Sequence, residues 1–144
     1  MKTNDRQIAD LMNSIQCGKI QLPDFQRGWV WDDNRIKALI ASITNGYPVG
    51  AAMFLEYGNS SIHFKYRVIE GSPSVDKIPD ELILDGQQRL TSVYTSLFSE
   101  NAVNTRTDKG QAIKRFYYID MEKAIDKNID RMDAIVSVPE NRIK

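Results

Sequence analysis

The sequence predicts an α+β domain, because helical and strand patterns are mixed along it without the regular alternation of a parallel α/β sheet. Apolar residues recur at the spacing of one helix face from Ile8 to Ile15 and again from Ile36 to Ile43. Short runs rich in β-branched and aromatic residues lie between the helical patterns and are typical of strands. The expected architecture is a small mixed sheet with flanking helices.

The first part of the chain predicts two helices with a strand between them. The first helix, over residues 8–15, is expected to end at Gly18, a residue type that terminates helices readily. A short strand over 19–22 follows. The second helix is expected to begin at Asp32 or Asp33, because an aspartate carboxylate accepts hydrogen bonds from the amides of the first turn.

The remainder of the chain predicts short strands and one longer helix. Residues 82–84 are expected to form a buried strand that leads directly into a helix with an apolar face. That face carries Leu90, Val93, Tyr94 and Leu97. Further strands are expected over 51–55, 63–69, 116–119 and 135–138, with a short helix over 121–128. A turn at 58–61 is expected to join two strands into a hairpin, and the polar stretch 100–110 is expected to be mobile.

The composition limits the classes of function. The chain has 144 residues, of which 42% are hydrophobic and 26% charged, and this suits one domain with a buried core. Nineteen basic residues balance nineteen acidic ones, which argues against a domain whose whole surface binds nucleic acid. Local basic patches are still compatible with this balance. No segment approaches the ~20 apolar residues that cross a membrane. We therefore expect a soluble, cytoplasmic protein without a membrane partner.

The scarcity of cysteine and histidine excludes several kinds of site. The one cysteine excludes an internal disulfide framework and a cysteine-based zinc site. The one histidine excludes a multi-histidine metal centre and leaves no HNH-type nuclease site in this chain. Any chemistry must therefore depend on carboxylates, amides, hydroxyls and basic side chains.

The clearest functional candidate is the segment Asp85-Gly86-Gln87-Gln88-Arg89, which follows a predicted buried strand. A strand that turns through a glycine into a helix presents free backbone N–H groups to an anion, and phosphate is the usual occupant. Gly86 allows close approach, Arg89 supplies a bidentate cation and the glutamines supply neutral donors. Asp85 suits a helix cap or a ligand of the Mg²⁺ that accompanies a nucleotide. An ordinary Asp-Gly turn, with Arg89 paired to a surface carboxylate, is the alternative.

The second candidate is the loop between the first strand and the second helix. It places Gln26-Arg27 among three aromatic residues, Phe25, Trp29 and Trp31. Aromatic side chains beside an arginine suit stacking on a base and pairing with a phosphate. The alternative is that the aromatic residues anchor the core at the start of the helix, and for the tryptophans we favour it. Both loops carry Gln-Arg, so their convergence on one pocket would be more informative than either loop alone.

These motifs resemble a known family. The stretch 22–31, the link 46–50 and the segment 85–91 look like the amino-terminal domain of the GmrSD family of modification-dependent restriction endonucleases. The similarity covers roughly residues 5–140 and implies a ParB/sulfiredoxin-like α+β fold. Family members are several hundred residues long and have a separate carboxy-terminal nuclease domain. The resemblance therefore implies a single domain over 1–144 that is truncated at its carboxy end, with its core at about 5–122.

The resemblance also implies a ligand and a site. In the family, the 85–91 loop is associated with the binding and hydrolysis of nucleoside triphosphates, which gates DNA cleavage. We therefore expect an NTP with Mg²⁺ and a regulatory role in phage restriction. The expected catalytic residues are Asp85, Gln87, Gln88 and Arg89, with Asp85 also as the metal ligand. The expected nucleotide-binding residues are Gln26, Arg27, Gly86, Arg89 and Thr91.

On this interpretation, Arg89 holds the phosphates, and Gln87 and Gln88 position phosphate oxygens or the attacking water. Arg27, with Gln26, contacts the phosphates or the base from the facing loop. Sulfiredoxins have a reactive cysteine at the place of Gln87, so cysteine phosphotransfer is disfavoured. DNA is expected as a partner through the missing carboxy-terminal domains, and self-association into a homo-oligomer is left open. Two other classes stand beside this one: a DNA-binding or ParB-like nuclease module, and a structural domain without a ligand.

Overall fold

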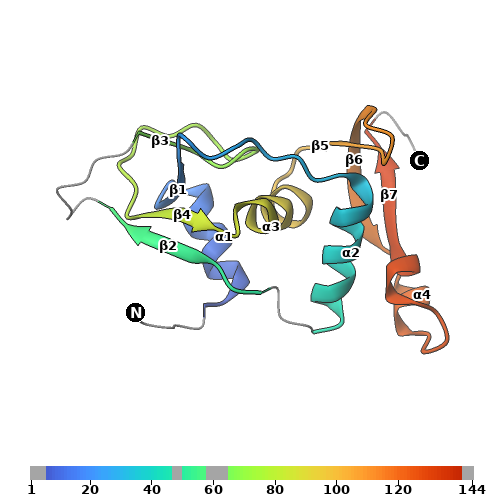
Figure 1. The fold of residues 1–144 in the computed structure, drawn as a ribbon. Helices are drawn as coiled ribbons and strands as arrows, with labels where there is room; N and C mark the ends of the chain where they lie inside the picture. The colour runs from blue at the N-terminus through green and yellow to red at the C-terminus, as the bar shows by residue number, and fades with distance from the viewer. Residues whose placement is uncertain (1–5, 47–49, 58–64, 141–144) are drawn as a thin grey trace.

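The computed structural model describes residues 6–46, 50–57 and 65–140. It consists of two small sheets with helices packed between and around them (Figure 1). The predicted α+β class is confirmed, and a second sheet is present beside the mixed sheet that we expected. The turn expected at 58–61 and the middle of the 46–50 link lie outside the described residues.

The first sheet has the strand order β2-β4-β1-β3. Its strands are β1 (Ile20–Pro23), β2 (Met53–Glu56), β3 (Tyr66–Arg67) and β4 (Glu81–Asp85). The central strands β1 and β4 are parallel, whereas each edge strand is antiparallel to its neighbour, so the sheet is mixed. Both central strands carry fully buried apolar side chains, including Ile20, Leu22, Leu82 and Ile83. The buried strand predicted over 82–84 is confirmed.

The expected hairpin is wrong. β2 pairs with β4 and β3 pairs with β1, so the two strands lie at opposite edges of the sheet. The edge position also explains why β2 is not the buried strand expected at 51–55, since Met53 is 48% exposed. Strands that follow one another in sequence are neighbours in most sheets, but here β4 and β1 lie between them.

The helices begin and end largely where the sequence indicates. They are α1 (Ile8–Gln16), α2 (Asp33–Thr44), α3 (Gln87–Val93) and α4 (Met121–Ile125), with a 3₁₀ turn at Arg131–Ala134. The end of α1 is followed by Gly18 in the left-handed conformation, with φ of 85°. The carboxylate of Asp32 accepts a 2.9 Å hydrogen bond from the N–H of Arg35 and caps α2. Both predicted helix ends are confirmed.

The helix α3 departs from its prediction at its carboxy end. A π-helical turn, Tyr94–Phe98, continues it. A π turn is wider than an α turn, so it shifts the following side chains around the axis. Leu97 is therefore 40% exposed, although Leu90 and Val93 of the same predicted face are buried.

The second sheet is antiparallel and has the order β5-β6-β7, with β5 (Val103–Arg106), β6 (Ala112–Ile119) and β7 (Ile135–Pro139). The strands expected over 116–119 and 135–138 are confirmed. β5, however, lies in the stretch 100–110 that we expected to be mobile. Val103 and Thr105 are buried and alternate with exposed neighbours, which is the pattern of a half-buried strand.

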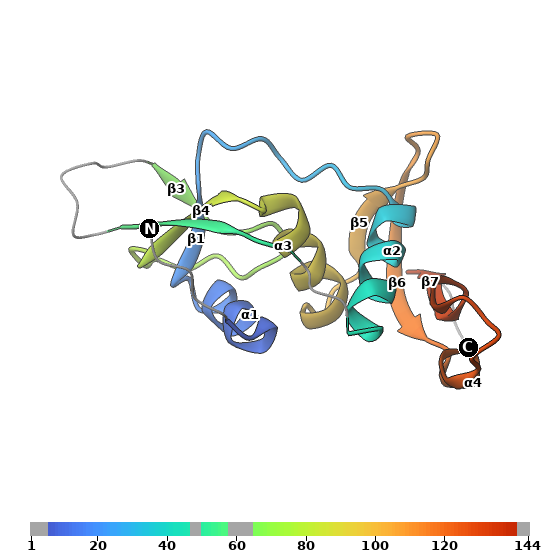
Figure 2. The same ribbon diagram turned by 60° about the horizontal axis from the view of Figure 1, so that its bottom comes forward.

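Two apolar cores meet along α2. Leu39 belongs to the core of the first sheet, whereas Ile36 and Ile40 belong to the core of the second sheet. The second core also contains Ile135, the first residue of β7. The helix α3 lies between the two sheets in both views (Figures 1 and 2). The first candidate segment, 85–89, which leads from β4 into α3, is thereby placed between the two sheets.

Candidate functional site

Side-chain amides join the two candidate loops. The Nε2 group of Gln26 donates hydrogen bonds to the main-chain oxygens of Ile83 (3.3 Å) and Leu84 (3.0 Å) in β4. In the opposite direction, Nε2 of Gln87 donates to the main-chain oxygen of Arg27 at 2.9 Å. The two Gln-Arg loops therefore do converge, and each is held by a glutamine of the other.

Gln88 completes this connection and uses both ends of its amide to do so. Its Nε2 group donates to the main-chain oxygen of Gly28 at 3.1 Å, and its Oε1 atom accepts from the N–H of Val30 at 2.9 Å. A side chain held at both ends fixes the loop shape, and it has little freedom to orient a water molecule. We refer to Gln26, Gln87 and Gln88 together as the glutamine clamp.

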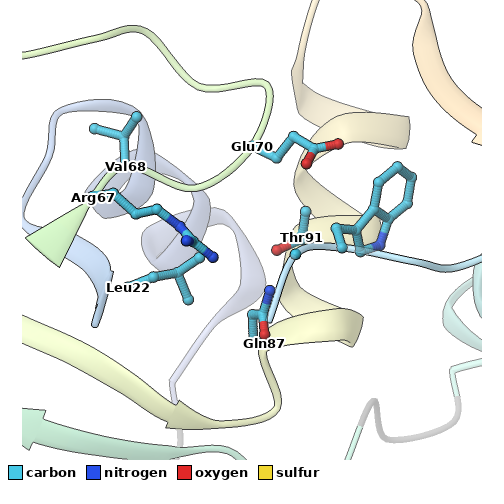
Figure 3. A pocket seen from close by; sticks show the side chains of 8 residues that line it. Leu22, Arg67, Val68, Glu70, Gln87 and Thr91 are labelled. Atoms are coloured by element: carbon cyan, nitrogen blue, oxygen red, sulfur yellow. The ribbon is translucent and has the colours of Figure 1, made fainter. Parts of the chain in front are cut away.

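A cavity of about 310 Å³ opens between the loop before α2, the segment after β3 and the first turns of α3. Figure 3 shows the side chains that surround it. The lining residues are Leu22, Gly28, Trp29, Arg67, Val68, Glu70, Gln87 and Thr91. The two candidate loops thus share a cavity whose third wall comes from a segment that sequence reasoning did not single out.

Arg67 supplies a cation to this cavity. In Figure 3 its guanidinium group reaches from the β3 side toward α3. It donates to the main-chain oxygens of Gln26 (2.9 Å), Asp24 (3.3 Å) and Arg27 (3.5 Å). Its Nη1 atom also lies 3.8 Å from Oδ1 of Asp24. A guanidinium has five N–H groups, so the Nε–H and one Nη1–H have no hydrogen-bond partner among the described residues. Arg67 therefore shapes the loop and retains donors for an anion.

Thr91 supplies a hydroxyl group that has no hydrogen-bond partner among the described residues. The residue is fully buried, and Figure 3 shows its oxygen turned toward the cavity. The neighbouring hydroxyls of Ser92 and Thr95 donate to main-chain oxygens four residues earlier, each at 2.8 Å. A buried polar group left without a partner costs about 1–3 kcal/mol. Such a group at a cavity wall is typical of a site that a ligand completes.

The aromatic residues of the loop before α2 differ in burial, and the tryptophans are the more buried ones, as we expected. Trp29 is 6% exposed, and its indole N–H donates to Oγ of Ser92 at 2.8 Å. It packs in the second core while it holds α3, so the prediction of a core anchor is confirmed. Trp31 is half-buried and packs against both cores. Phe25 is 66% exposed and is therefore not a core anchor.

Glu70 is the one carboxylate that lines the cavity. Burial raises the pKa of its carboxyl group, while the positive charges of Arg67 and Arg106 lower it in part. A carboxylate opposite a guanidinium makes the cavity polar without giving it a strong net charge. A ligand with both an anionic part and hydrogen-bond donors suits such a lining.

Arg89 lies away from the cavity. Its Nη2 group donates to the main-chain oxygen of Ala51 at 2.6 Å, and a Cβ on Gly50 would collide with its Nη1 group. Helix geometry explains the direction, because residues two apart on a helix point to nearly opposite sides while residues four apart share a face. Gln87 and Thr91 therefore line the cavity together, and Arg89 between them does not.

Arg27 and Asp85 are also absent from the cavity wall. The side chains of both are exposed, and for Arg27 it is the main-chain oxygen that contacts α3. Neither Arg27 nor Arg89 is among the residues that line this cavity. No group of three or more His, Cys, Asp or Glu side chains within 6–46, 50–57 and 65–140 is arranged to hold a metal ion.

Comparison with known proteins identifies the family. The sequence matches the family described as "GmrSD restriction endonuclease, N-terminal domain" over residues 8–141, which is nearly the whole chain. The chain belongs to this family. Membership confirms the resemblance carried by the two Gln-Arg loops and indicates a protein of a restriction system.

This GmrSD N-terminal domain is also similar to a longer archaeal protein. It is 32% identical over 130 residues to "Uncharacterized protein MJ0686" of Methanocaldococcus jannaschii, and the match covers 87% of the chain. The chain spans only 22% of that relative's length. Within the part of the chain that the structure describes, every helix is too short or too polar to cross a membrane.

Sequence reasoning missed Arg67 and Glu70 in this GmrSD N-terminal domain. Both lie in or just after a run that reads only as a strand of β-forming residues. Their place in the site depends on the pairing of β3 with β1, in which Arg67 lies opposite Leu22. That pairing joins residues far apart in the sequence, so no local sequence pattern predicts it.

Proposed function

We propose that this domain binds a nucleoside triphosphate, accompanied by Mg²⁺, in the cavity between the loop before α2 and the helix α3. We further propose that the bound nucleotide regulates DNA restriction by a longer protein of which this domain is one part. The observation that carries the proposal is the unpartnered hydroxyl of Thr91 opposite the guanidinium of Arg67, in one cavity built by the two Gln-Arg loops.

The chemistry of these two groups suits a phosphate. The Nε–H and one Nη1–H of Arg67 have no hydrogen-bond partner among the described residues, and one of them can donate to a phosphate oxygen while the guanidinium charge attracts the anion. The hydroxyl of Thr91 can donate to a second oxygen, which would remove the cost of burying it without a partner. The glutamine clamp holds both walls in place before the ligand arrives, so little ordering is needed on binding.

Magnesium binding and hydrolysis make different demands on the protein. A Mg²⁺ ion that accompanies a nucleotide is held largely by phosphate oxygens and water, with one or two carboxylates at most. It therefore needs no acidic cluster in the protein. Phosphoryl transfer needs a positioned water and charge stabilisation at the reacting phosphate. Because Gln88 and Arg89 are engaged with main-chain atoms, we propose that hydrolysis requires groups supplied from outside this chain.

Thermal unfolding of the 144-residue chain, with Mg²⁺ and each of the four ribonucleoside triphosphates, tests the binding step. At one hundred times its dissociation constant, a ligand that binds only the folded state adds about 2.7 kcal/mol of stability. We expect such a gain for the unmodified chain and a clearly smaller gain in Thr91→Val, which removes the hydroxyl but keeps the shape of the side chain.

Thr105→Val is the matched control, because Thr105 is also a buried threonine but lies in the second sheet. It should keep the response to nucleotide. The absence of a response to any triphosphate in the unmodified chain would overturn the proposal. If the chain instead bound duplex DNA tightly and with strong salt dependence, a DNA-binding module would be the better assignment. If neither a triphosphate nor duplex DNA binds, a structural domain without a ligand would be favoured.

A further inference from the structure

A second cavity adjoins the first and differs from it in chemistry. Its volume is about 430 Å³, and it lies between the π turn that continues α3 and the face of the second sheet that carries Asn104, Lys114 and Phe116. Trp29 and Glu70 line both cavities, so the two share a wall. The first cavity alone is at the low end of the ~300–1,000 Å³ that ligand sites occupy, whereas the two together lie well within that range.

The charges of the second cavity exclude a phosphate there. Its lining includes three carboxylates, from Glu70, Glu100 and Glu140, and a single ammonium group, from Lys114. That ammonium lies 3.9 Å from a carboxylate oxygen of Glu140, so its charge is already balanced. A highly charged anion would meet repulsion here, whereas hydroxyl and amino groups would find acceptors.

The same cavity offers groups that recognise a base. The ring of Phe116 is half-buried at its wall, and aromatic rings stack on bases of any sequence. The side-chain amide of Asn104 is exposed in the cavity on the neighbouring strand, and an amide can both donate to and accept from a base edge. The two cavities therefore divide into an anion-binding part and a part suited to neutral polar groups.

We propose that one ribonucleotide occupies both cavities, with its phosphates at Arg67 and Thr91, its ribose at Glu70 and its base in the second cavity beside Phe116. This assignment rests on the proposed function, since it extends the ligand from the phosphate site. Glu70 supplies the carboxylate common to both cavities, and this carboxylate is an acceptor for ribose hydroxyl groups. A deoxyribonucleotide would leave that acceptor short of a donor and bind less tightly.

Four probes separate the parts of the ligand when they are titrated into the chain by calorimetry: a ribonucleoside triphosphate, its deoxy analogue, the free nucleoside and inorganic triphosphate. We expect inorganic triphosphate to bind, but at least about tenfold more weakly than the nucleotide. The deoxy analogue should bind several-fold more weakly than the ribonucleotide. The free nucleoside, which lacks the phosphates, should bind most weakly.

Variants at the second cavity assign the base and sugar. Phe116→Leu should weaken the ribonucleotide about tenfold and leave inorganic triphosphate unchanged. Tyr118→Leu is the matched control, because Tyr118 is an exposed aromatic residue on the same face of β6 that does not line the cavity. Glu70→Ala, which removes the acceptor, should reduce the preference for the ribonucleotide over its deoxy analogue to near unity.

The outcomes distinguish this assignment from the proposed function. If neither the nucleotide nor inorganic triphosphate binds, the phosphate site itself is wrong. If both bind equally tightly, or if Phe116→Leu binds the nucleotide as the unmodified chain does, the phosphate site stands and the extension into the second cavity is overturned. Equal affinity for the ribo and deoxy forms in the unmodified chain would overturn the placement of the ribose at Glu70.

Discussion

Two buried threonines, one beside each sheet, show how the two halves of the molecule differ. Thr105 in β5 is 7% exposed, and its hydroxyl donates to the main-chain oxygen of Trp31 at 2.7 Å. Thr91 in α3 is fully buried, and its hydroxyl has no partner within the described residues. The same side chain is thus satisfied internally in one half and left for an external partner in the other.

In the half that contains the second sheet, other polar side chains also form hydrogen bonds within the protein. Oδ1 of Asp33 accepts hydrogen bonds from the hydroxyls of Tyr117 (2.6 Å) and Ser137 (2.8 Å) and so ties α2 to two strands. Burial, together with the nearby charge of Asp33, raises the pKa of Tyr117, which keeps its hydroxyl protonated as a donor. The contrast indicates that the second half satisfies these buried polar groups internally, whereas the first half leaves the hydroxyl of Thr91 for a ligand.

The largest expected effect comes from breaking the link between the halves. Trp29→Ala should lower the free energy of unfolding by about 3–5 kcal/mol, because it removes a buried aromatic side chain from the second core. Urea denaturation followed by circular dichroism measures the change. Trp29→Phe keeps most of the packing and loses only the hydrogen bond to Ser92. It should therefore lower the free energy of unfolding clearly less than Trp29→Ala does. A loss below about 1 kcal/mol for Trp29→Ala would show that the indole does not join the halves.

A change of intermediate size is expected at the satisfied threonine. Thr105→Val leaves the main-chain oxygen of Trp31 without its donor and should destabilise the chain by about 1–3 kcal/mol. The same denaturation experiment measures it. If the variant proved as stable as the unmodified chain, water would have to reach that oxygen. This part of the molecule would then be open to solvent.

The threonine without a partner should give a change of opposite sign. Thr91→Val removes a buried hydroxyl that makes no hydrogen bond among the described residues, so we expect the ligand-free chain to gain up to about 1 kcal/mol. Comparison of the two valine variants in one titration series is the sharpest test of the contrast between the halves. A loss of stability in Thr91→Val would mean that the hydroxyl is satisfied within the protein.

The smallest effect is expected at Glu70 and depends on pH. Because burial raises the pKa of this carboxyl group in the folded state, ionising it as the pH rises through that pKa destabilises the fold. Glu70 is exposed at the surface, so solvent screens much of this effect. Glu70→Gln should therefore be only marginally more stable than the unmodified chain at neutral pH. The gain should vanish below the ordinary pKa of a glutamate. Unfolding midpoints measured across this range check the sign.

Much of the fold could be predicted because local physics decides it. The cap at Asp32, the stop at Gly18 and the apolar face of α2 each depend on neighbours within one or two helical turns. The failures are long-range or involve a local departure from regular geometry. The positions of β2 and β3 at opposite edges depend on pairing across the sheet, and the exposure of Leu97 depends on a π turn.

The candidate site was predictable in part for the same reason. Gln87 and Thr91 of the predicted set do line the cavity, and their spacing of four residues on one helix places them together. The same helical geometry predicts that Arg89, two residues from each of them, points away from the pocket that they share. Arg67 could not be found from its neighbours, because its place depends on strand pairing. The catalytic and metal-binding roles assigned from the resemblance stay predictions.

The glutamine clamp has a consequence for redesign of the pocket. Its bonds to residues 27 and 28 end on main-chain oxygens, so the clamp is indifferent to the side chains that those residues carry. Gly28 lines the cavity, its φ angle is not positive, and a Cβ added there would meet no other atom within 4 Å. A library of residues at position 28 could therefore alter ligand selectivity at the cavity mouth while the loop keeps its shape.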